Sequence, residues 1–153
     1  MAGRTVLVSA SAPGTTGAPA PQPGYPAAYR LTFGAARKIA TIHPLFSDEA
    51  RARLANAGAR GRVVLLALTD PDSNAIVPAG ARRFAGTFEL TSQGDKEQVY
   101  LGRTAAGHLR LRVLRLSQSV DDTAWALTRH GRFYATDQAA DTVDIVTGRF
   151  PAG

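Results

Sequence analysis

Short apolar segments recur along the second half of this chain at a spacing that suits strands rather than helices. From Arg62 onward the segments hold about five residues each, are rich in valine, isoleucine, leucine or aromatic side chains, and are bounded by turn-forming residues. Turns recur about every 8–12 residues, and this spacing is typical of antiparallel all-β domains. The expected strands are 63–68, 75–77, 87–90, 98–101, 109–113, 123–127, 132–136 and 142–146.

The first part of the chain has a different composition. Most of residues 1–26 is rich in proline, glycine and alanine without apolar periodicity, which predicts a flexible arm, with Thr5–Ser9 as an isolated strand. The β-rich domain is then expected over residues 27–153. Its first element, Tyr29–Phe33, alternates apolar with polar side chains, and with Lys38–Ile42 after a turn at Gly34 it predicts a hairpin.

One segment carries helix signals. Ser47 can cap the N-terminus of a helix over Ser47–Ala57, Asp48 and Glu49 suit the positive end of its dipole, and Gly58 can end it. Because its apolar face is small, we expect one short surface helix.

Two turn segments have similar sequences. Thr69–Ile76 and Thr136–Val143 share the frame T-D-x-x-x-[N/D]-[A/T]-[I/V], and each follows an apolar segment. In each copy the Asp can accept hydrogen bonds from free N–H groups of a turn, so Asp70 and Asp137 are expected to be equivalent turn residues. A repeated strand–turn unit is also a feature of propeller blades.

The stretch Asp121–Phe150, DDTAWALTRHGRFYATDQAADTVDIVTGRF, resembles blades of YVTN/NHL-like β-propellers, especially uncharacterised propeller-like proteins of high-GC bacteria. The resemblance covers about 30 residues and implies a partial β-propeller or propeller-like blades, with a small β-sandwich as the alternative fold. A propeller of about four blades needs more chain than this, so the domain is expected to be incomplete, with closure through missing blades or self-association. The resemblance also suggests export, although no signal peptide is expected in this chain.

Several acidic and amide side chains are candidate metal ligands. The order Asp70-x-Asp72-x-Asn74 matches the first ligands of a calcium loop, but Ala75 and Ala81 stand where such a loop needs its glycine and its bidentate glutamate. An Asp-rich turn is therefore favoured over a calcium site.

A second metal hypothesis uses Asp121 and Asp137, together with Asp122, Asp141 and Asp144. In lactonase-type propellers, metal-binding acids converge at the central channel, and these residues lie at predicted strand ends. This arrangement indicates a degenerate metal-dependent, lactonase-like hydrolase as an alternative function. No nucleophile elbow, P-loop, dinucleotide fingerprint or HExxH motif occurs in the sequence, so a non-enzymatic protein without a resident cofactor is preferred.

Composition narrows the remaining classes. The chain of 153 residues has no cysteine, which excludes disulfides and thiol chemistry, and no apolar run long enough to span a membrane, which predicts a soluble protein. Its net charge of +6 comes almost entirely from arginines in small groups along the sequence. This scatter disfavours nucleic-acid binding, which remains the third hypothesis. The preferred function is a propeller-like binding or scaffolding module of unknown ligand.

Overall fold

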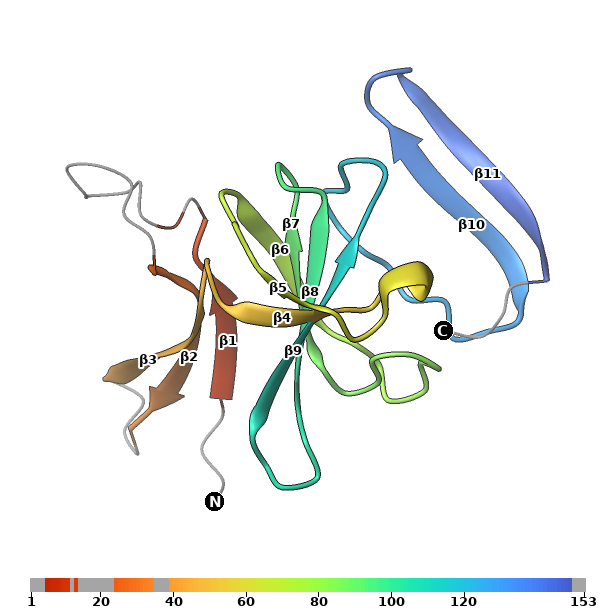
Figure 1. Ribbon diagram of the computed structural model, residues 1–153. Coiled ribbons are helices and arrows are strands. Elements are labelled where there is room, and N and C mark those ends of the chain that lie inside the picture. Colours follow the sequence, from red (N-terminus) through yellow and green to blue (C-terminus); the bar gives the residue numbers. More distant parts are fainter. Residues whose placement is uncertain (1–4, 12, 14–23, 35–38, 150–153) are drawn as a thin grey trace.

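The computed structural model describes residues 5–11, 13, 24–34 and 39–149, and these fold almost entirely into strands (Figure 1). The predicted all-β, mainly antiparallel class is confirmed. The strands are β1 (Thr5–Ser9), β2 (Pro26–Phe33), β3 (Ala40–Ser47), β4 (Arg51–Leu54), β5 (Val63–Leu65), β6 (Pro71–Ile76), β7 (Phe88–Ser92), β8 (Glu97–Arg103), β9 (Leu109–Arg115), β10 (His130–Asp137) and β11 (Thr142–Arg149), with one 3-10 turn, η1 (Ala57–Ala59).

The first three strands form a sheet of their own in the order β1-β2-β3. β2 and β3 make the hairpin expected from the alternation of apolar residues, with Phe33 opposite Ala40. β1 is not isolated, because it pairs antiparallel with β2 from Thr5 opposite Thr32 to Ser9 opposite Ala28. Most of the predicted flexible arm lies outside the described residues.

A six-stranded sheet in the order β5-β4-β9-β8-β7-β6 forms the body of the molecule. The consecutive strands β6, β7, β8 and β9 form an antiparallel meander. The sheet then continues through a parallel pairing of β4 with β9, in which Arg53 lies opposite Arg112. This parallel pair joins an early strand to the last strand of the meander.

Apolar side chains pack against both faces of this sheet. Since successive strand residues point to opposite faces, Leu90 and Val99 face one side while Tyr100 faces the other. The larger cluster includes Ala28 and Phe46, and so lies between the six-stranded sheet and the β1–β3 sheet. The smaller cluster, on the opposite face, consists of Ala55, Val77, Ala81, Phe84 and Tyr100, with Leu114 and Trp125 packed against it.

The last two strands stand apart from the body as a two-stranded hairpin (Figure 1). Phe133 lies opposite Val146 and Tyr134 opposite Ile145. All four of these side chains are exposed, although aromatic residues in predicted strands are usually expected to be core residues. The hairpin therefore presents apolar side chains to solvent on both of its faces.

The prediction of a helix over Ser47–Ala57 is wrong. β4 occupies the middle of this segment, with Ala52 and Leu54 buried and Arg51 and Arg53 exposed, as the period of two in a strand requires. Pairing to β5 on one side and β9 on the other stabilises the strand and overrides the local capping signals.

Three further strand and turn assignments also change. β5 covers only the first half of the predicted 63–68 strand and is a partly exposed edge strand. The turn expected after Asp70 is strand β6 instead, and Pro71 is tolerated there because it begins an edge strand. Residues 123–127 form no strand.

Across the described ranges, no helix is long and apolar enough to cross a bilayer.

Candidate functional site

A row of charged and aromatic side chains crosses the outer face of the six-stranded sheet, opposite the β1–β3 sheet. Arg53 on β4 lies opposite Arg112 on β9, and Arg112 lies opposite Tyr100 on β8. Tyr100 in turn lies opposite Glu89 on β7. Like charges that face each other across strands are destabilising, so the Arg53–Arg112 pair marks an unusual position in the sheet.

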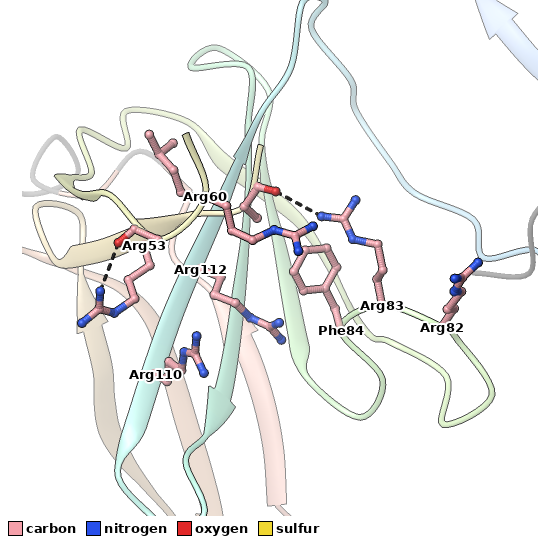
Figure 2. A pocket seen from close by; sticks show the side chains of 10 residues that line it. Arg53, Arg60, Arg82, Arg83, Phe84, Arg110 and Arg112 are labelled. Carbon is pink, nitrogen blue, oxygen red and sulfur yellow. Dashed lines mark hydrogen bonds between the residues drawn. The ribbon is translucent and has the colours of Figure 1, made fainter. Parts of the chain in front are cut away.

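This row leads into a hollow of about 670 Å³ (Figure 2). Three elements supply its walls: the strand pair β4 and β9, the turn around η1, and the loop between β6 and β7. We call it the arginine hollow, because six of its ten lining residues are arginines: Arg53, Arg60, Arg82, Arg83, Arg110 and Arg112, with Leu54, Ala55, Gly61 and Phe84.

Backbone carbonyls and an aromatic ring hold several of these guanidinium groups. Arg53 donates to the carbonyl of Gly61 at 3.0 Å, and Arg83 donates to the carbonyl of Ala55 at 3.2 Å. The guanidinium carbons of Arg83 and Arg112 lie over the Phe84 ring, 4.9 and 4.4 Å from its centroid. These partners are uncharged, so they position the arginines without neutralising them.

Phe84 has an uncommon backbone conformation for a bulky residue. Its φ of 59° lies in the left-handed region, which costs roughly 1–2 kcal/mol for a residue with a side chain. The ring is buried and stacks on Tyr100 with a centroid distance of 3.8 Å and an interplanar angle of 6°. Packing on the sheet therefore offsets the strain and fixes the loop that carries Arg82 and Arg83.

A buried polar network supports this stack. Glu89, only 1% exposed, accepts a hydrogen bond from the indole Nε1 of Trp125 at 2.7 Å. The Tyr100 hydroxyl lies 3.0 Å from Oε1 of Gln98 and 3.5 Å from Oε1 of Glu89. Burial, together with the Glu89 carboxylate, raises the pKa of Tyr100 well above its usual value. Tyr100 therefore remains neutral at physiological pH and acts as a packing platform.

No acidic side chain lines the arginine hollow, although all twelve of the chain's Asp and Glu residues lie in its described part. Among the described residues, the one salt bridge joins Arg115 to Glu97 at 2.8 Å, and Arg115 is not part of the hollow. Partial burial and the neighbouring Arg110 and Arg83 charges lower the pKa of Arg112. An anion in the hollow would relieve this repulsion.

The acidic residues singled out from the sequence lie elsewhere. Desolvation, together with the charge of the nearby Asp121 carboxylate, raises the pKa of Asp72, and Asp70 adds to the effect. Asn74 instead donates a hydrogen bond to the hydroxyl of Ser9 at 3.1 Å. Within the ranges the structure describes, no three His, Asp or Glu side chains are grouped as a metal site requires. Divalent-metal binding at these residues stays an alternative hypothesis.

Asp137 and Asp70 occupy different structural positions. Asp137 ends β10, and its carboxylate accepts hydrogen bonds from the backbone N–H groups of Ala139 and Ala140 at 2.9 and 3.1 Å, as expected of a turn residue. Asp70 directly precedes β6, where Thr69 is held by Asp95 through two hydrogen bonds. The expected equivalence of Asp70 and Asp137 is therefore wrong.

Sequence reasoning missed the arginine hollow. The alternation in Leu109–Val113 places Arg110 and Arg112 on one face of a strand, and Arg82 and Arg83 are adjacent in the sequence. What the sequence does not reveal is the β4–β9 pairing, which brings Arg53 beside Arg112.

The comparisons with known proteins add no relative: no family model, no curated protein and no solved structure matches the chain.

Proposed function

We propose that this protein is a non-catalytic binding module that takes an anionic ligand in the arginine hollow. The observation that carries the proposal is the gathering of six arginines around one hollow that has no acidic residue in its lining. Guanidinium groups bind phosphate and sulfate through paired, charge-assisted hydrogen bonds. Repulsion of Arg112 by Arg110 and Arg83 costs free energy in the empty site, and a bound anion would attract all three guanidinium groups.

The architecture also fits a propeller-like module. The meander β6–β9 has the four consecutive antiparallel strands of a propeller blade, and the segment that resembles such blades contains the β10–β11 hairpin. The exposed apolar faces of that hairpin support closure through further blades or other chains. In this arrangement the hollow is the ligand site of a larger assembly.

The test is a thermal melt of the full chain with and without pyrophosphate. A ligand that binds only the native state stabilises it by about 2.7 kcal/mol at a concentration 100 times its Kd. The wild type should therefore melt at a higher temperature with pyrophosphate, whereas Arg53→Gln/Arg112→Gln should not respond. The control is Arg51→Gln, which removes an exposed arginine of the same strand that does not line the hollow.

The control should respond like the wild type. The proposal fails if the wild type shows no pyrophosphate-dependent shift, or if the double variant keeps the full shift.

A further inference from the structure

We infer that the ligand of the arginine hollow is a compact, non-aromatic molecule with three or more clustered phosphate groups, such as a polyphosphate chain or a polyphosphorylated polyol. This inference rests on the anion-binding function proposed above and narrows it to one chemical class. It uses three features of the hollow: its number of charges, its lack of an open aromatic face, and the fixed positions of its arginines.

The number of arginines in the hollow determines how much negative charge a matching ligand must carry. Each phosphate group can accept paired hydrogen bonds from guanidinium groups on more than one side. If a phosphate engages two arginines, the six arginines of the hollow call for about three phosphates. A single orthophosphate or carboxylate would leave most of the like charges unpaired in a space of about 670 Å³. Densely charged ligands therefore fit the hollow better than singly charged ones.

The hollow offers no platform for a nucleobase. Strand-binding proteins stack bases on open aromatic rings. Among the described residues, Phe84 is the only aromatic one in the lining, and its ring is already engaged by Tyr100 at 3.8 Å and by the guanidinium groups of Arg83 and Arg112. The other apolar lining residues, Leu54 and Ala55, are buried. Recognition must therefore act on phosphate groups rather than on a base.

Several arginines are held in place before a ligand arrives. Arg53 is tied to the Gly61 carbonyl, Arg83 to the Ala55 carbonyl, and Arg112 to the Phe84 ring. Fixing charged side chains in advance reduces the entropy lost on binding, provided that the ligand's charges match their spacing. The contacts come from three different elements, so they favour a compact cluster of phosphates over an extended strand that touches one side.

Isothermal titration of the full chain at 150 mM salt, at roughly physiological ionic strength, tests the inference. The probes are orthophosphate, inorganic tripolyphosphate, ATP, inositol hexakisphosphate and an oligothymidylate of twelve nucleotides. We expect tripolyphosphate or inositol hexakisphosphate to bind at least tenfold more tightly than orthophosphate, and the tighter of the two identifies a chain or a polyol. ATP should bind no more tightly than tripolyphosphate, because its base finds no partner.

The variant Arg60→Gln/Arg110→Gln removes two exposed arginines of the hollow that do not hold Phe84. It should fold normally by circular dichroism and bind the tighter polyphosphate at least tenfold more weakly, while Arg51→Gln binds like the wild type. The inference is overturned, and the anion-binding function kept, if the oligonucleotide binds more tightly than either polyphosphate and the variant loses this binding. If no probe binds in a way that depends on the hollow arginines, both fail.

Discussion

The stack of Phe84 on Tyr100 makes a quantitative prediction for Phe84→Leu. Leucine keeps most of the buried apolar volume and the same left-handed backbone, so the backbone strain largely cancels. What is lost is one stacked aromatic pair, worth about 0.5–1.5 kcal/mol, and two cation–π contacts whose guanidinium groups still reach solvent, worth about 0.5–1 kcal/mol each. The free energy of unfolding should therefore fall by about 1.5–3.5 kcal/mol.

Urea unfolding followed by the fluorescence of Trp125, the only tryptophan, measures this loss. With a denaturant slope of about 2 kcal/mol per molar urea, the midpoint should fall by about 0.7–1.8 M. The matched control is Phe133→Leu, the same change in a ring that is 44% exposed on the β10–β11 hairpin, which should cost less than about 0.5 kcal/mol. If Phe84→Leu is no more costly than Phe133→Leu, the stack does not fix the loop as argued.

Three further predictions concern the network behind the hollow and the hairpin. Glu89→Leu leaves the indole N–H of Trp125 without its acceptor and should reduce the free energy of unfolding, measured in urea, by about 1–3 kcal/mol. Glu89→Gln keeps an acceptor oxygen and should therefore cost less. Equal losses in the two variants would contradict the assigned hydrogen bond. Because burial and Glu89 raise the folded-state pKa of Tyr100 above its usual 10.0, its contribution to stability is complete below about pH 10 and is lost as the pH rises toward the folded-state value. Melts between pH 9 and 11, about the window in which an unfolded tyrosine ionises, should therefore fall more steeply for the wild type than for Tyr100→Phe, and parallel slopes would refute this. On the exposed hairpin, Ile145→Asp should change the free energy of unfolding of the body by less than about 0.5 kcal/mol, and a larger loss would mean that the hairpin packs against the body.

Local patterns in the sequence were enough to predict the class of the fold. The alternation at Leu109–Val113 predicted β9, and the turn segment Thr136–Val143 predicted the β10–β11 hairpin, because both depend on neighbours close in the chain. Ser47–Ala57 was misread as a helix because its strand partners are supplied by β5 and β9, and β9 lies far along the sequence.

The same distance explains why the site was missed. Each pair of arginines, such as Arg82 with Arg83, is visible in the sequence, and singly each is an ordinary surface group. The arginines form one site because the strand register places Arg53 opposite Arg112 and because the aromatic stack holds the Phe84 loop over the sheet. Neither the register nor the stack follows from composition or periodicity.

The parallel pairing of β4 with β9 also has a kinetic consequence. Arg53 and Arg112 are 59 residues apart in the chain (112 − 53), and the meander β6–β9 can assemble from near neighbours before this contact closes. Long-range pairings of this kind form slowly because the intervening loop must be closed first. Here closure also gathers arginines of both strands around one hollow, so counterions that screen their positive charge lower the barrier to this pairing. Anions that bind the folded hollow should therefore also accelerate the pairing of β4 with β9 during folding.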